Sequence, residues 1–232
     1  MSCIQLIAFD LDGTLVDSAP DIARAVDSMC RELKAAPPAA GNVREWMGDG
    51  VRRLVKRALT GQPDGEPEAA LYQRGFETFR RAYRAHLAVE TRVYPGARET
   101  LEQLLAAGMY LACITNKSAE FTEPLLAALQ LRSYFGLVLS GDSLAHRKPD
   151  PLPLLRAARH FEVEPAQACM VGDSRNDLLA AQSARFIAVG VHYGYGEDLS
   201  DLKPDAVLNS LAELPPLLQS WNTGLASASI NR

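Results

Sequence analysis

The sequence predicts an α/β protein whose core is a doubly wound parallel sheet carrying an inserted, all-helical cap. Three observations support this fold class. Short, nearly continuous apolar runs recur at residues 4–9, 109–114, 136–140, 168–172 and 186–191, as expected for strands covered on both faces. Helical patterns follow most of these runs, which favours βα alternation and a parallel sheet. Between residue 18 and about residue 90, helical patterns follow one another with no strand run between them.

The first strand, at residues 4–9, is followed by the cap and not by a second strand. Within residues 18–90, the segments 18–34, 43–59 and 68–87 each have a helical pattern. We therefore expect a core of residues 1–16 and 91–221, a cap of residues 17–90, and a polar tail of residues 222–232. Ser18 and Ser118 stand where they can cap helices that begin at residues 19 and 119.

The composition narrows the classes of function and the location. Of the 232 residues 47% are hydrophobic, which is enough for a sizeable core, and the net charge of -4 gives no basic field that would attract nucleic acid. No apolar run approaches the roughly 18 residues of a membrane span, and the first residues do not resemble a secretion signal. The four cysteines show no CxxC spacing. We expect a cytoplasmic protein with reduced thiols and no membrane partner.

Polar side chains follow several of the predicted strands. Asp10 and Asp12 come after the first strand, Thr115 and Asn116 (with Lys117) after the second, and Asp173 and Asp177 after the run at 168–172; Lys148 follows the run at 136–140. Because the carboxyl ends of parallel strands meet at one edge of the sheet, we expect these side chains to lie together there.

Carboxylates, a lysine and neutral donors suit a divalent cation and a phosphate group. Mg²⁺ takes few protein ligands and shares its other positions with water and phosphate oxygens. With its charge compensated by the ion and by Lys148, Asp10 could attack phosphorus, and Asp12 could act as acid and base. Each motif taken singly has a simpler interpretation, such as a solvated strand end, a turn or a helix cap. Their order at consecutive strand ends favours a joint site.

Four segments carry a family resemblance. "FDLDGTLVDS", "ITNK", "RKPDP" and "VGDSRND" resemble, in order, the four motifs of the haloacid dehalogenase superfamily, and the resemblance extends over essentially the whole chain. More narrowly, the sequence is similar to the phosphoglycolate phosphatases. The resemblance implies a magnesium-dependent phosphatase that converts 2-phosphoglycolate to glycolate through an aspartyl-phosphate.

The resemblance also implies a role for each motif residue. Asp10 would be the nucleophile and a metal ligand, and Asp12 the acid/base, with its backbone carbonyl on the metal. Thr115 and Asn116 would hold the phosphoryl oxygens, Lys148 would balance charge, and Asp173 would complete the metal site. Asp177 would be a more distant or alternative ligand. The aspartate at position 12 favours phosphoryl transfer over carbon–halogen cleavage, in which no alkoxide leaves.

The cap should decide which substrate is hydrolysed. The cap segment that is most informative about the substrate is residues 48–59. It begins with Gly48 and Gly50, which allow a tight turn, and continues with the basic residues Arg52, Arg53, Lys56 and Arg57. One of these side chains, or the N–H groups of the turn, could meet a substrate carboxylate when the cap closes; the alternative is a solvated basic face.

A cap of this size favours a small phosphate monoester as the partner. The alternatives are another sugar-phosphate or pyrophosphate phosphatase, a β-phosphoglucomutase-like phosphotransferase, and, in a different class, a non-catalytic phosphate-binding regulator. Either a monomer or a homodimer agrees with the sequence.

Overall fold

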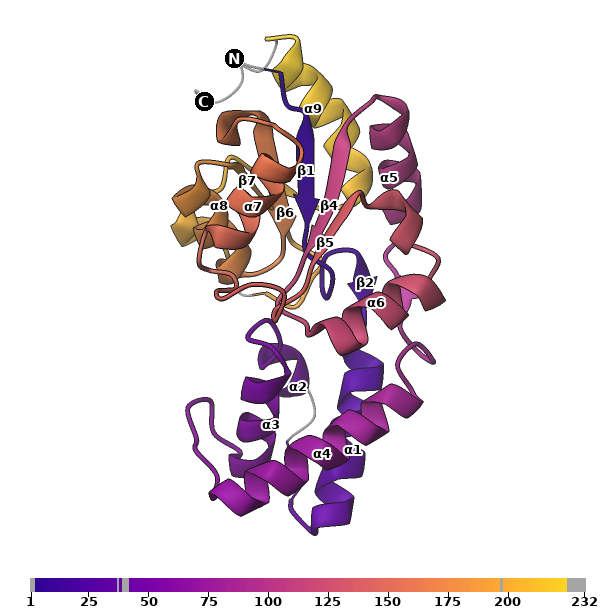
Figure 1. The fold of residues 1–232 in the computed structure, drawn as a ribbon, viewed down its shortest axis with the longest axis vertical. Coiled ribbons are helices and arrows are strands. Elements are labelled where there is room, and N and C mark those ends of the chain that lie inside the picture. Colours follow the sequence, from indigo (N-terminus) through magenta and orange to yellow (C-terminus); the bar gives the residue numbers. More distant parts are fainter. Residues whose placement is uncertain (1–2, 37, 39–41, 197, 225–232) are drawn as a thin grey trace.

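The core of the protein is a six-stranded parallel sheet (Figure 1). The computed structural model describes residues 3–36, 38, 42–196 and 198–224. In the order β5-β4-β1-β6-β7-β8, the strands are Leu137–Leu139, Tyr110–Ile114, Leu6–Phe9, Ala168–Gly172, Ile187–Val191 and Ala206–Leu208. The chain builds outward from β1 on one side and then on the other, so the carboxyl end of β1 lies at the switch point of the sheet, where ligands bind in open α/β folds. The predicted α/β fold is confirmed.

Helices cover both faces of the sheet. α5 (Ala97–Ala106), α6 (Ala119–Ala128) and α9 (Leu214–Asn222) pack on the face that receives Ile7 and Phe9, whereas α7 (Leu152–His160) and α8 (Arg175–Ala184) pack on the face that receives Leu6 and Ala8. This alternation along β1 follows from the two-residue repeat of a strand. Short 3₁₀ turns lie at Arg132–Tyr134, Pro165–Gln167, Ser200–Leu202 and Leu211–Glu213.

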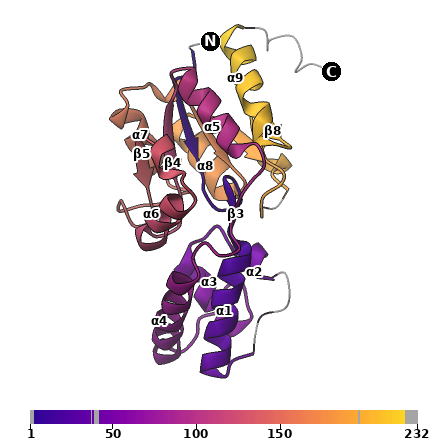
Figure 2. The same cartoon turned by 90° about the vertical axis from the view of Figure 1, so that its right-hand side faces the viewer.

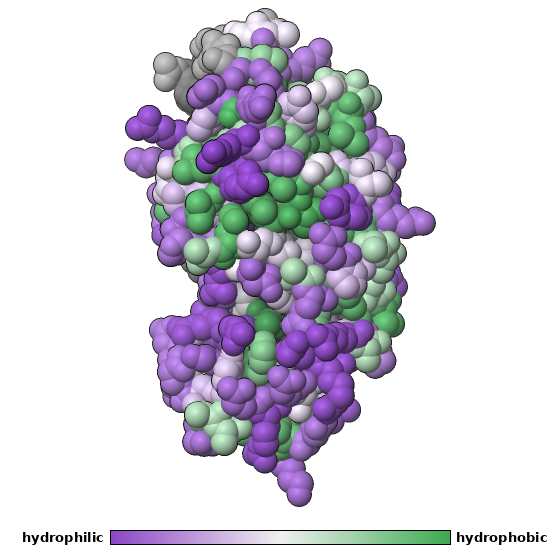
Figure 3. Space-filling model, in the orientation of Figure 1, coloured by the Kyte–Doolittle hydropathy of each residue, from purple (hydrophilic) through white to green (hydrophobic). Residues whose placement is uncertain are grey.

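The second part of the molecule is a helical cap below the carboxyl end of the sheet (Figures 1 and 2). It contains α1 (Ala19–Leu33), α2 (Asn42–Glu45), α3 (Val51–Thr60) and α4 (Ala69–Ala85), and has a hydrophobic cluster of its own. On the face drawn in Figure 3, hydrophilic side chains cover most of the cap, and apolar ones are more frequent over the core. The chain leaves and re-enters the core through the antiparallel strands β2 (Val16–Asp17) and β3 (Arg92–Val93).

A buried carboxylate ties the two connections together. Asp21, at the start of α1, accepts hydrogen bonds from the backbone N–H groups of Glu90 (2.9 Å) and Thr91 (2.8 Å) and from the Thr91 hydroxyl (2.8 Å). The outgoing and returning segments are therefore fixed to each other where the cap begins.

Several local expectations are wrong. The helix predicted over 43–59 is broken into α2 and α3, because Gly48 and Gly50 adopt φ angles of +97° and +78°. Ser18 and Ser118 precede α1 and α6 as expected, but neither side chain accepts a capping hydrogen bond. Asp142 accepts from the Ala119 N–H instead. The start of the predicted tail, Asn222, closes α9, and residues 225–232 lie outside the described residues.

Cys30, Cys113 and Cys169 are buried and free, and Cys3 is exposed and free. Of the helices in the described part of the chain, none combines the length and the apolar character that a membrane crossing needs.

Candidate active site

The predicted site residues meet at the carboxyl ends of the central strands. Asp10 follows β1, Thr115 and Asn116 follow β4, and Asp173 follows β6. Lys148 reaches the same place from the loop between β5 and α7, and all of these side chains are buried. The structure thus brings together residues separated by up to 163 positions in the chain.

Lys148 lies between two carboxylates. Its Nζ is 2.8 Å from an Asp10 oxygen and 2.6 Å from Asp177 Oδ1, and it also donates to the backbone carbonyl of Ile114. Burial acts to lower the pKa of Lys148, but the carboxylates of Asp10 and Asp177 outweigh it and raise that pKa. Lys148 is therefore a permanent positive charge against Asp10.

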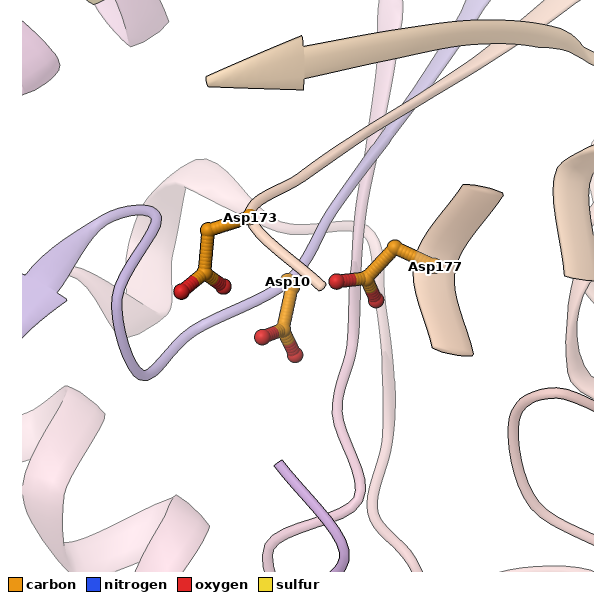
Figure 4. A group of neighbouring side chains, drawn as sticks. All are labelled: Asp10, Asp173 and Asp177. Carbon is orange, nitrogen blue, oxygen red and sulfur yellow. The ribbon is translucent and has the colours of Figure 1, made fainter. Parts of the chain in front are cut away.

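Three carboxylates gather at this point. Asp10, Asp173 and Asp177 each place an oxygen within 4.8 Å of the others, and Figure 4 shows the three side chains next to one another. Burial, with the neighbouring carboxylates, raises the pKa of Asp173 to about 8; burial, only partly offset by Lys148, raises the pKa of Asp10 to about 6. Buried acids with raised pKa values and hard oxygen donors fit a divalent cation, which would compensate their charge.

The orientation of Asp173 is fixed by two loops. The backbone N–H of Tyr195 donates to Asp173 Oδ2 at 2.7 Å, and the Thr14 hydroxyl donates to Oδ1 at 3.3 Å. Gly13, at φ +86°, passes so close that a Cβ there would lie 2.2 Å from Oδ2. A side chain at position 13 would therefore displace the carboxylate.

Asp177 has two contacts that use different oxygens. Its Oδ2 accepts from the backbone N–H (3.0 Å) and the hydroxyl (2.6 Å) of Ser174 in a capping box at the start of α8, while Oδ1 faces Lys148. This residue both caps the helix and holds Lys148 in position.

Asp12 contacts two side chains, Lys117 and Ser18, that were not predicted to be its partners. Lys117 Nζ lies 2.9 and 3.0 Å from its two carboxylate oxygens, and the Ser18 hydroxyl donates to Oδ1 at 2.5 Å. Lys117 is almost fully buried. Burial acts to lower the pKa of Lys117, but the Asp12 carboxylate outweighs it and raises that pKa. The sequence signal for Lys117 was its place directly after Asn116.

Asn116 links the cap to the core. Its Nδ2 donates to the carbonyl oxygens of Gly48 in the cap (3.0 Å) and of Lys148 in the core (2.9 Å). The Thr115 hydroxyl accepts from the Lys117 N–H at 3.2 Å. Gly48 and Gly50 both line the cavity between cap and core, and their role toward a substrate stays a prediction.

The basic side chains of α3 have partners within the cap. Arg53 pairs with Asp64, Lys56 with Glu66 (2.6 Å) and Arg57 with Asp49 (2.7 Å). The Arg52 guanidinium lies over the Phe76 ring, 4.9 Å from its centroid. These contacts favour the alternative in which the basic residues form a surface face of the cap. That the substrate meets Arg52 or Arg53 stays a prediction.

A cavity of about 50 Å³ lies between the cap and the core, and the site residues line it. Asp10, Asp12, Lys117 and Lys148 belong to its core side, and Leu54, Phe79 and Tyr83 are among the cap residues that line it. A cavity needs at least roughly 10–15 Å³ to hold one water, so this one has room for a few waters. A wider cleft of about 700 Å³, lined by Asp12, Asp173 and Tyr195 among others, adjoins the same site.

Comparisons with known proteins agree with this geometry. The family described as haloacid dehalogenase-like hydrolase matches residues 4–185. The chain is 47% identical over 218 residues to a phosphoglycolate phosphatase of Nitrosospira multiformis, covering 93% of this chain and 96% of that protein. It is 44% identical to one of Nitrosococcus oceani, covering 92% and 96%. The crystal structure of a predicted phosphoglycolate phosphatase from Haemophilus somnus superposes with a TM-score of 0.88 at 35% identity, covering 94% of this chain and 99% of that one.

Proposed function

The chain belongs to the haloacid dehalogenase-like hydrolases, and on this premise we propose that it hydrolyses 2-phosphoglycolate to glycolate and inorganic phosphate. One observation carries the proposal: Asp10, buried at the end of β1, is held against Lys148 in a cavity that it shares with a second carboxylate, Asp12. The names of the similar proteins support phosphoglycolate as the substrate.

Mg²⁺ is the proposed cofactor. Asp10 and Asp173 would hold it through their carboxylates and Asp12 through its backbone carbonyl, with Asp177 as an alternative ligand. When bound, the ion compensates carboxylate and phosphate charge, so that an anionic nucleophile and an anionic substrate can approach each other.

The protein's own residues supply the remaining steps. Asp10 attacks phosphorus and becomes an aspartyl-phosphate while the ester bond breaks. Asp12 gives a proton to the departing alkoxide and later takes one from the water that cleaves the aspartyl-phosphate. Lys148 neutralises Asp10 and the phosphate, and Thr115 and Asn116 lie where they can orient phosphoryl oxygens.

Other phosphatases and phosphotransferases of the same fold remain the competing functions, and a non-catalytic phosphate-binding protein is the competing class. We further propose a cytoplasmic location, because the buried free thiols need no oxidising compartment. Both a monomer and a homodimer are consistent with this proposal. The boundaries of the cap at residues 17 and 90 stay a prediction.

A panel of phosphate monoesters tests the function. We expect kcat/KM for 2-phosphoglycolate to exceed that for glucose 6-phosphate and glycerol 3-phosphate by roughly tenfold or more, because one charge-assisted hydrogen bond contributes about 1.5–3 kcal/mol. A sugar phosphate or a pyrophosphate as the preferred substrate would contradict the assignment. Lack of turnover of every ester, including p-nitrophenyl phosphate, in the presence of Mg²⁺ would favour the non-catalytic class.

Magnesium binding should depend on pH. Because the folded-state pKa values of Asp10 and Asp173 are raised to about 6 and about 8, the metal-free folded state binds more protons than the unfolded chain. The free energy of unfolding of the metal-free protein should therefore decrease as the pH rises through these values. Mg²⁺ needs both carboxylates ionised, so its apparent affinity should increase at least about tenfold between about pH 6 and pH 8.5.

Titration of the thermal unfolding temperature with Mg²⁺ at both pH values measures this effect. Asp173→Asn should remove most of the Mg²⁺-dependent rise in unfolding temperature, whereas Asp201→Asn, at an exposed position, should keep it. An apparent affinity that is the same at both pH values would contradict the buried-acid metal site.

The choice of metal ion should also affect turnover. Ca²⁺, which prefers larger and looser coordination, should restore turnover poorly after chelation.

A further inference from the structure

Lys117 is a buried cation of the site to which the proposed reaction gives no task. Its side chain is 5% exposed, it comes from the loop after β4, and its Nζ reaches both oxygens of Asp12 at 2.9 and 3.0 Å. Lys148, not Lys117, compensates Asp10. Burying an ammonium costs desolvation free energy. Its position beside the proposed acid/base therefore indicates a functional role.

The chemistry of the substrate places its carboxylate near this ammonium. In 2-phosphoglycolate a single CH₂ separates the ester oxygen from the carboxylate carbon, so standard bond lengths bring a carboxylate oxygen within about 3–4 Å of the leaving oxygen. Asp12 must come within roughly 2.6–3.2 Å of that same leaving oxygen to protonate it. A cation bonded to Asp12 therefore lies within reach of the carboxylate.

A second polar group faces the same space from the cap. Tyr83 in α4 is 1% exposed, and its ring centroid lies 4.9 Å from Lys117 Nζ. Its hydroxyl is buried next to the Lys117 ammonium, and Tyr83 lines the cavity between cap and core. The ammonium and the hydroxyl therefore form a pair of neighbouring donors that an anionic group in the cavity could bind. The walls beside it are apolar, at Leu54, Phe79 and Phe121.

We propose that Lys117 is the specificity-determining residue that binds the substrate's carboxylate, with the Tyr83 hydroxyl as a second donor. This inference rests on the proposed phosphoglycolate activity. On binding, Lys117 moves its ammonium from Asp12 toward the substrate carboxylate, and Asp12 turns to the leaving oxygen. Three of the α3 basic residues, Arg53, Lys56 and Arg57, already pair with carboxylates of the cap, and the Arg52 guanidinium lies over the Phe76 ring.

The test compares two alkyl phosphates that both need a protonated leaving group, 2-phosphoglycolate and ethyl phosphate. Lys117→Met should lower kcat/KM for 2-phosphoglycolate roughly 10- to 100-fold more than it lowers kcat/KM for ethyl phosphate, because the loss of its ion pair with Asp12 affects both esters alike. Tyr83→Phe should have the same selectivity with a smaller loss. Lys117→Arg, which keeps the charge, should recover part of the preference. Lys203→Met, an exposed lysine-to-methionine control, should change neither substrate.

Inhibitor binding gives a readout that does not depend on turnover. Wild-type protein should bind 3-phosphonopropionate, the carbon analogue of the substrate, more tightly than propylphosphonate, and Lys117→Met should remove most of this difference. Equal losses on both phosphates, or an unchanged inhibitor preference, would overturn the inference and leave Lys117 as a residue that only positions Asp12. If wild-type protein does not hydrolyse 2-phosphoglycolate at all, the proposed function itself fails, and the inference with it.

Discussion

Asp10→Asn is expected to reduce hydrolysis of every phosphate monoester by roughly 10⁴-fold or more, because the amide cannot act as the nucleophile. Asp10 is the first residue after β1, it is buried, and it is held at 2.8 Å from Lys148. The loss should be the same for alkyl and aryl phosphates, since every ester must be attacked by this carboxylate.

Rapidly quenched reaction mixtures, analysed as intact protein by mass spectrometry, give the direct measurement. Wild-type protein should contain a phosphorylated species that Asp10→Asn lacks. Asp177→Asn is the matched control, because it also removes a carboxylate that faces Lys148 but keeps Asp10. It should weaken turnover and still form the phosphorylated species. A phosphorylated Asp10→Asn protein would exclude Asp10 as the nucleophile.

The core could be predicted from sequence because local patterns encode it. Buried strands such as β1 and β6 need unbroken apolar runs, and the motif residues directly follow these strands. β8 was missed because only three apolar residues, Ala206–Leu208, stand between Asp205 and Asn209, whereas the equally short β5 lies in a longer apolar run. The break between α2 and α3 falls at Gly48 and Gly50, where a tight turn was expected even though a helical pattern continues on both sides.

Side-chain partners were harder to predict, because they depend on contacts between distant segments. Ser18 has the sequence context of a helix cap, yet its hydroxyl donates to Asp12. Ser118 has the same context, but Asp142 from another loop caps the helix. The closeness of Lys117 to Asp12 and Tyr83 joins three segments of the chain, and no local pattern could reveal it.

Asp12→Asn is the second change with a large expected effect, and the size of the effect should depend on the leaving group. Alkoxides need a proton as they depart, so kcat/KM for 2-phosphoglycolate and ethyl phosphate should fall by about 10²- to 10⁴-fold. Nitrophenolate leaves without a proton, and p-nitrophenyl phosphate should lose much less in the first step.

Asp12→Asn breaks the ion pair with Lys117 as well as removing the acid. Comparing alkyl with aryl phosphates distinguishes these two effects. Asp12→Asn removes the carboxylate from a buried ammonium that is 5% exposed, and breaking a buried pair costs about 3–5 kcal/mol. The unfolding temperature should therefore fall as well.

A damaged or partly unfolded site would lower turnover of alkyl and aryl phosphates together, because the same protein molecules hydrolyse both. Loss of the acid alone lowers phosphorylation by alkyl phosphates only. Single-turnover phosphorylation of the protein by each substrate separates the two causes, since it reports the first step before water enters. Parallel losses would remove Asp12 from the acid/base role and leave it as the structural partner of Lys117.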